Sequence, residues 1–248
     1  MVSLAAAFLL LSQRQQRYNL VFLASCEEEV SGKGGIEAVL PLLPKIDVAL
    51  VGAPPGLHPA VAEKGLMVLD GEIAGKSGHA ARDEGENAIY KALPMIERLR
   101  SLSFPLTSAH LGPVKISVTQ ISAGTQHNGV PDMCRIVVDV RTTDAYTNAQ
   151  TLEMIRQAVP FCKLTPRSVR LRPSGISEQH PIVRRLVIAG RKPFGSPTLS
   201  DQALMPFPSL KIGPGDSARS HTADEYITYD EIREAIQIYF TTLDGLAL

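Results

Sequence analysis

The residues with most chemical potential stand in Tyr18–Gly35, which reads YNLVFLASCEEEVSGKGG. Three adjacent carboxylates, those of Glu27, Glu28 and Glu29, directly follow an apolar run, Leu20–Ala24. Like charges repel, and burial of a carboxylate is costly unless a cation or hydrogen-bond donors compensate it. The segment therefore fits either a solvated turn or a loop that faces a metal ion.

A second polar loop, GPGDSARSHTADEYI, follows the apolar run Ser209–Ile212 and contains His221. In α/β folds, ligands bind in the loops beyond the carboxyl ends of the strands. A lone histidine in a loop is more often solvated than bound to a metal. A histidine and a carboxylate pair at the same sheet edge, however, favour a hydrolytic metal site.

The cysteines and the overall charge exclude several classes of protein. Cys26, Cys134 and Cys162 are odd in number and widely spaced, which argues against a disulfide framework and fits a reducing cytoplasm. Lys plus Arg equals Asp plus Glu at 25 each, so the chain carries no basic footprint for nucleic acid. The opening MVSLAAAFLLLSQRQQ is too short to span a bilayer and has no basic residue before its apolar part, which indicates a packed helix and no membrane partner.

The elements that must position these loops follow the sequence pattern of an α/β fold. Apolar runs and helical patterns alternate at both ends of the chain, which predicts a parallel, buried sheet flanked by helices. The predicted strands are Leu20–Ala24, Val48–Val51 and Ser209–Ile212. The predicted helices are Ile36–Leu43, Pro181–Gly190, a helix start at PTLSDQALM, and Asp230–Leu243 with Asp230 as its N-cap.

The middle of the chain has a different order of predicted elements, the β-α-β-β-α-β order of the ferredoxin-like motif. This order predicts a small α+β domain over residues 63–173, inserted into an α/β domain made of residues 1–62 and 174–248. Its predicted elements are strands 66–74, 113–122, 134–142 and 169–172, and helices 87–100 and 148–159.

Six motifs resemble, in this order, those of the M20 family of dinuclear zinc amidohydrolases: CEEEVSGKGG, VGAPPGLHPAVAEKG, GKSGHAA, HNGVPD, VDVRT and ARSHTADEYI. The chain resembles most the acetylornithine deacetylase-type members and also the succinyl-diaminopimelate desuccinylases. The resemblance implies a zinc-exopeptidase-like α/β/α sandwich with an inserted ferredoxin-like dimerisation domain, and a homodimer. It implies zinc or cobalt as the cofactor and an N-acyl amino acid, such as N-acetyl- or N-succinyl-ornithine, as the substrate.

The same resemblance implies roles for single residues. Glu28 corresponds to the general base that activates water, and Glu29 and His221 correspond to metal ligands. His79, in the inserted domain, corresponds to a residue that stabilises the oxyanion in the partner subunit's active site. Residues implied to contact the substrate or line its acyl pocket are Asn128, Arg141, Thr198, Ser200, Asp201, Gly213 and Gly215. For Arg141 the alternative is a surface strand residue, and for Ser200 a plain helix cap.

Two departures from the family set the expected activity. Family members begin with a segment that carries a zinc-binding His, its neighbouring Asp and a bridging Asp, and no such segment precedes Met1. Ala53, in VGAPP, stands where relatives have a carboxylate ligand, and Asp47 falls at the opposite end of the predicted strand. We therefore expect an N-terminally truncated metal-dependent deacetylase with an impaired site. The alternatives are a non-catalytic dimerising remnant, and a dipeptidase or carboxypeptidase of the same family.

Overall fold

A computed structural model describes residues 1–82 and 84–248. The contacts divide the chain into two compact units, which are described separately. The first unit consists of Met1–Glu63 and Ser174–Leu248, and the second of Lys64–Pro173. Glu63 belongs to the first unit because the strand that it ends pairs there with Ser174.

The first unit is built around a five-stranded sheet in the order β1-β11-β2-β10, with β9 also paired to β2. The strands are β1 (Ala49–Val51), β2 (Ala60–Glu63), β9 (Ser174–Gly175), β10 (Phe194–Ser196) and β11 (Ser209–Lys211). β1 runs parallel to β11 and β10 parallel to β2, whereas β2 is antiparallel to both β11 and β9. The sheet is therefore mixed and not parallel throughout, because the short strands β2, β9 and β10, which the apolar runs did not reveal, join the predicted ones.

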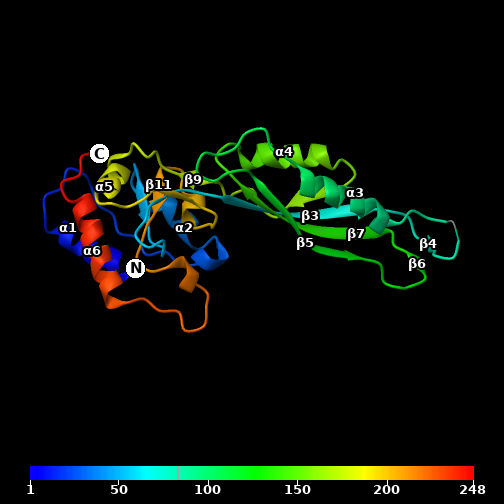
Figure 1. Ribbon diagram of the computed structural model, residues 1–248, viewed down its shortest axis with the longest axis horizontal. Coiled ribbons are helices and arrows are strands. Elements are labelled where there is room, and N and C mark those ends of the chain that lie inside the picture. Colours follow the sequence, from blue (N-terminus) through cyan, green and yellow to red (C-terminus); the bar gives the residue numbers. More distant parts are fainter. Residues whose placement is uncertain (83) are drawn as a thin grey trace. The chain divides into compact units, whose positions relative to one another are not determined.

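Helices cover this sheet and complete the first core. They are α1 (Val2–Ser12), α2 (Ile36–Val39), α5 (Pro181–Ile188) and α6 (Tyr229–Leu243). α1 and α6 lie side by side, as Figure 1 shows. The core holds Leu11 of α1, Leu210 and Ile212 at β11, and Tyr239 of α6, whose hydroxyl donates to the Ile212 carbonyl at 2.9 Å. The sheet and the C-terminal helix are thereby fixed at the end of β11, next to the loop that carries His221.

Besides the parallel sheet, two further predictions for the first unit are wrong. Leu20–Ala24 forms no strand, because a strand needs a neighbour to complete its ladder and no described strand pairs with this segment. Helix α6 is capped by Thr228 and not by Asp230. The Thr228 side chain accepts from the Glu231 N–H while the Glu231 side chain accepts from the Thr228 N–H, a capping box that Asp230 cannot form from inside the first turn.

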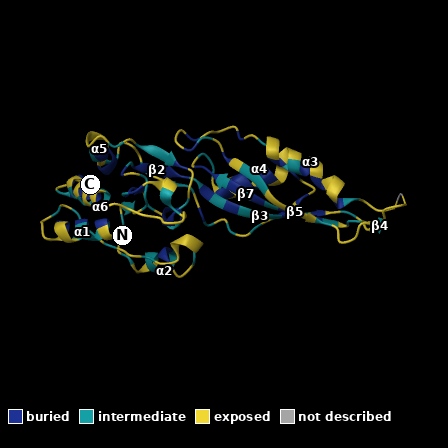
Figure 2. Cartoon of the chain, turned by 60° about the horizontal axis from the view of Figure 1, so that its bottom comes forward, coloured by how far each residue is buried: buried dark blue, intermediate teal, exposed yellow. Residues whose placement is uncertain are grey.

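The second unit contains a four-stranded antiparallel sheet in the order β5-β7-β3-β8, with helices α3 and α4 on one face (Figure 1). Buried and partly exposed residues alternate along β3 and β7, as expected of a sheet with one covered face (Figure 2). The elements are β3 (Gly65–Ala74), β5 (Lys115–Ala123), β7 (Met133–Thr142), β8 (Lys163–Pro166), α3 (Ala88–Ser101) and α4 (Asn148–Ala158).

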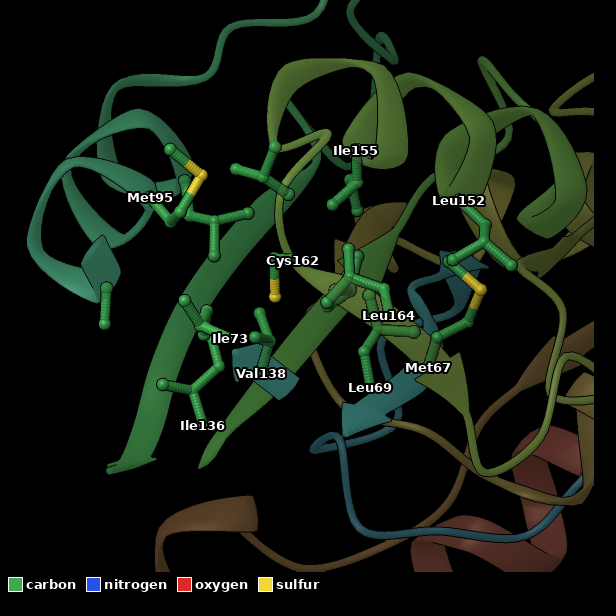
Figure 3. Close-up of a cluster of buried hydrophobic side chains, with 14 of the residues drawn as sticks. Met67, Leu69, Ile73, Met95, Ile136, Val138, Leu152, Ile155, Cys162 and Leu164 are labelled. Atoms are coloured by element: carbon green, nitrogen blue, oxygen red, sulfur yellow. The ribbon is translucent and has the colours of Figure 1, made fainter. Parts of the chain in front are cut away.

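The covered face forms a core of its own, in which side chains of the strands and of both helices meet (Figure 3). Cys162 is buried there, and burial raises the pKa of its thiol to about 11. The last strand is β8 and not 169–172 as predicted. α4 ends at Ala158, the chain turns at once, and buried Leu164 pairs opposite Gly71 of β3. The strand therefore starts earlier than the apolar pattern indicated.

A separate two-stranded antiparallel ladder pairs β4 (Gly78–His79) with β6 (Gly129–Val130). In the part of the chain that the structure describes, no helix is long and apolar enough to cross a membrane.

Candidate metal and catalytic site

The loop Glu27–Gly35, here called the acidic loop, is folded around the carboxylate of Glu27. Glu27 has a φ of 59°, and its Oε2 accepts a hydrogen bond from the N–H of Gly34 at 2.9 Å. A Cβ at Gly32 or Gly34 would overlap the Glu27 side chain, so the two glycines leave room for the carboxylate in this position. The first of the three carboxylates is thus compensated by a backbone donor, and it shapes the loop.

Glu28 and Glu29 start a single 3₁₀ turn, η1 (Glu28–Val30), within this loop. Partial desolvation raises the pKa of Glu28, and the carboxylates of Glu29, Asp201 and Glu63 raise it further, while Lys211 acts in the opposite direction. A carboxylate with a raised pKa is a better proton acceptor than an ordinary one. The environment of Glu28 therefore suits a general base.

Glu29 meets His221, which comes from the loop after β11. The distance from His221 Nε2 to Glu29 Oε2 is 3.8 Å, and the two side chains are 78% and 75% exposed. His221 has a φ of 59°, a conformation that is uncommon for non-glycine residues, and its N–H donates to Glu225 Oε2 at 3.2 Å. Two donors on one tetrahedral zinc stand roughly 3.3 Å apart, given bond lengths of about 2.0–2.1 Å. The pair therefore matches a zinc ion in chemistry and nearly in spacing.

The number of ligands falls short of a complete site. Among residues 1–82 and 84–248, no group of three or more His, Cys, Asp or Glu side chains could hold a metal ion. A catalytic zinc takes three protein ligands and leaves one position open. Ala53, just beyond β1, offers no carboxylate, and a Cβ on Gly213 would overlap the Ala53 carbonyl oxygen. The described residues thus supply two candidate ligands and not a full set.

A buried ion pair lies close to Glu28, and the sequence patterns did not reveal it. Lys211 of β11 pairs with Glu63 of β2, and Lys211 Nζ also donates to Thr198 Oγ1 at 2.9 Å. Ser200 donates to Glu63 Oε2 at 2.6 Å and also caps the 3₁₀ helix η3 (Asp201–Leu204). The structure shows Ser200 as the helix cap that was the alternative to a substrate contact, and the substrate contact stays a prediction. A signal was present, since Glu63 and Lys211 are opposite charges placed in short apolar strands, AVAE and SLK.

The candidate residues of the second unit lie at the β4–β6 ladder and on β7. His79 pairs with Gly129 across this ladder, and the Ala80 N–H donates to the Asn128 carbonyl at 2.9 Å, which brings His79 and Asn128 together. On β7, Arg141 donates to both carboxylate oxygens of Asp139, at 2.9 and 3.1 Å. The guanidinium fork of Arg141 is therefore engaged within its own strand.

Comparison with known proteins gives these loops a context. The family model described as "Peptidase dimerisation domain" matches residues 61–160. The chain is 29% identical over 244 residues to an acetylornithine deacetylase of Myxococcus xanthus, with 90% of this chain and 63% of that protein covered. It is 26% identical to a putative succinyl-diaminopimelate desuccinylase of Mycobacterium tuberculosis, with 91% of this chain and 67% of that protein covered. The chain is thus similar to the M20 dimerisation domain over residues 61–160 and to an acetylornithine deacetylase over most of its length.

The fold agrees with that of solved M20 peptidases. A Bacillus subtilis protein described as a dinuclear metal binding peptidase from the M20 family matches with a TM-score of 0.72 at 17% identity, covering 97% of this chain and 69% of that one. Aminopeptidase PepT of Bacillus cereus matches with a TM-score of 0.77 at 18% identity, covering 98% of this chain and 69% of that one. The mixed α/β architecture with an inserted dimerisation domain is thus the fold of these M20 structures. The chain spans about two thirds of the length of the curated proteins that it matches.

Proposed function

We propose that this chain is a metal-dependent amidohydrolase of the M20 kind, which cleaves the N-acyl amide of a small amino acid. The names of the similar proteins support N-acetylornithine and N-succinyl-diaminopimelate as members of the substrate class. The observation that carries the proposal is the approach of His221 to Glu29 in the loop where Glu28 has a raised pKa.

In this proposal Glu29 and His221 would hold the metal, for which zinc or cobalt would suit one carboxylate and one imidazole donor. When bound, the metal supplies Lewis acidity and lowers the pKa of water. Glu28 then accepts the proton of the attacking water at its carboxylate, which the desolvation around it favours. His79 stabilises the oxyanion in the partner subunit's active site, and Asn128, which lies beside it at the β4–β6 ladder, contacts the substrate. Arg141 binds the carboxylate of the substrate when it exchanges Asp139 for that ligand.

One observation favours a second candidate, a non-catalytic chain that dimerises or binds a ligand. The described residues bring two metal ligands together and not three. With two donors, a divalent ion is held weakly. The two candidates therefore differ in the amount of metal bound and in turnover, both of which can be measured.

The test compares three proteins: the chain of 248 residues, its Ala53→Glu variant, and Ala53→Glu preceded by a family-type N-terminal segment carrying the His and Asp ligands. Zinc per chain and hydrolysis of N-acetylornithine, N-succinyl-diaminopimelate and a dipeptide are measured for each. Stoichiometric zinc and turnover of an acyl-amino acid in the third protein support the proposal. Turnover of the dipeptide alone redirects it to a peptidase, and zinc without turnover in all three supports the non-catalytic candidate.

In whichever of the three proteins is most active, the substitution Glu28→Gln separates the catalytic role of the acidic loop from its metal-binding role. This variant is expected to retain zinc and to lose turnover, whereas Glu29→Gln or His221→Ala loses both. Asp47→Asn is the matched carboxylate control, because Asp47 is exposed, precedes β1 and pairs only loosely with Lys45 at 3.2 Å. A loss of turnover in the control equal to that of Glu28→Gln would contradict the assignment of Glu28.

A further inference from the structure

The buried ion pair of the first unit is tied into a larger set of polar contacts. Lys211 and Glu63 have side chains only 7% and 1% exposed, and Lys211 Nζ donates to Ser196 Oγ at 3.0 Å as well as to Thr198. The second carboxylate oxygen of Glu63 accepts from Ser200. Each charge is therefore matched by its partner and by hydroxyl groups, which a buried pair requires to remain ionised.

These contacts continue as far as the acidic loop. Ser200 caps η3, and the first residue of η3 is Asp201. Asp201 Oδ2 accepts from Ser25 Oγ at 2.7 Å, and Ser25 precedes the acidic loop with only Cys26 between them. An unbroken series of contacts therefore runs from β11 through Glu63, Ser200 and Asp201 to Ser25.

The acidic loop needs such an anchor, because the chain that leads into it has none of its own in the sheet. Residues 20–24 pair with no described strand, so no strand pairing fixes the position of the loop that follows them. Hydrogen bonds among buried and partly buried groups are strong and directional, since water competes little for them. The Ser25–Asp201 bond can therefore fix the start of the loop, provided that η3 is itself fixed.

We propose that Lys211 and Glu63 are positioning residues that hold η3 and, through Asp201 and Ser25, fix the acidic loop in the conformation that presents Glu28 and Glu29. The catalytic use of that loop conformation rests on the proposed function, but the positioning of the loop by these contacts does not. Lys211 also keeps a positive charge beside the carboxylates of Glu28, Asp201 and Glu63, which otherwise repel one another.

Amide hydrogen exchange of the loop tests this directly. The N–H groups of Ser31 and Gly32 donate to Glu28 and Glu27 carbonyls, and that of Gly34 donates to the Glu27 carboxylate, so all three amides report on the folded loop. In Ser25→Ala and Lys211→Met we expect their exchange to be about fivefold faster or more, as expected when a net hydrogen bond is lost from a local opening equilibrium. Amides of α6, in the same unit, serve as the internal reference.

Matched variants separate positioning from general destabilisation. Tyr18→Phe removes another hydrogen bond of the first unit, from the Tyr18 hydroxyl to the Leu243 carbonyl at 2.8 Å, and is expected to leave loop exchange unchanged. Ser25→Thr keeps a hydroxyl and is expected to restore most of the protection. If Lys211→Met fails to fold, Ser25→Ala and Ser200→Ala carry the test.

Loop exchange equal to the unsubstituted chain in both Ser25→Ala and Ser200→Ala would overturn the inference. Exchange that rises equally in the loop and in α6 would also overturn it, since the effect would then be global. Faster loop exchange in a protein that shows neither zinc binding nor turnover supports the positioning of the loop by these contacts and contradicts the proposed function. Turnover together with unchanged loop exchange supports the proposed function and overturns the inference that these contacts fix the loop.

Discussion

Nε2 of His221 lies 3.8 Å from Oε2 of Glu29, although the two residues stand near opposite ends of the sequence. Both belong to loops of the first unit, one ahead of α2 and the other after β11. An imidazole and a carboxylate are a combination of donors that zinc accepts. The approach of these two side chains supports the proposal that the acidic loop faces a metal ion.

The first prediction concerns metal content. The chain of 248 residues is expected to retain less than one zinc per chain after dialysis, because two exposed ligands hold the ion weakly. His221→Ala and Glu29→Gln should each remove the residual zinc, whereas Asp47→Asn should not. Elemental analysis of the four proteins checks this. Stoichiometric zinc in the unsubstituted chain would show that other side chains complete the site.

A second prediction concerns the close approach of two backbones beneath the site. Gly213 lies against Ala53, and a Cβ added there would overlap the Ala53 carbonyl. We expect Gly213→Ala to lower the free energy of unfolding by about 1–3 kcal/mol, the usual cost of overpacking. Gly129→Ala is the matched control, since nothing lies within 4 Å of its added Cβ, and should change stability by less than about 0.5 kcal/mol. Urea unfolding measures both, and equal effects would contradict the argument.

The third prediction is a pH dependence of stability at helix α5. His180 caps this helix, with Nδ1 accepting from the Ile182 N–H at 3.3 Å, and burial lowers the pKa of His180 below 6.5. Between the folded and unfolded pKa values the unfolded chain binds more protons, so the contribution of His180 is complete above the unfolded value and is lost as the pH falls below it.

Unfolding at about pH 7.5 and about pH 5.5, on either side of an ordinary histidine pKa, measures this loss. His180→Asn keeps a capping side chain that does not titrate, and should reduce the difference between the two pH values. If the difference stays the same in this variant, other groups are responsible for it.

The fourth prediction concerns assembly through the second unit. Strand β5 lies at the edge of its sheet, and helix α3 exposes Tyr90 and Leu93 at 71% and 57%. We expect a homodimer in which β5 or α3 lies at the two-fold axis, since edges and apolar faces of this kind are covered in stable proteins. Leu93→Lys should shift sedimentation toward the monomer, while Phe161→Lys, on an exposed residue outside α3 and β5, should not. A monomer at micromolar concentration before any substitution would contradict the dimer.

The sequence by itself determined the elements whose patterns are local. Strands β3, β5 and β7 and helices α3, α4, α5 and α6 agree with the predicted segments to within a few residues, because apolar period and capping residues act over short distances. The ordered motifs also pointed to an M20 relative, and to Glu28, Glu29 and His221 as the residues of interest.

Only the tertiary structure decided which partners these residues have. It left Leu20–Ala24 without a ladder and buried Lys211 against Glu63 next to the acidic loop. A strand depends on a neighbour, and an ion pair on a second charge from another strand. Neither is encoded in the segment itself, since both arise when distant segments pack together and water is excluded between them.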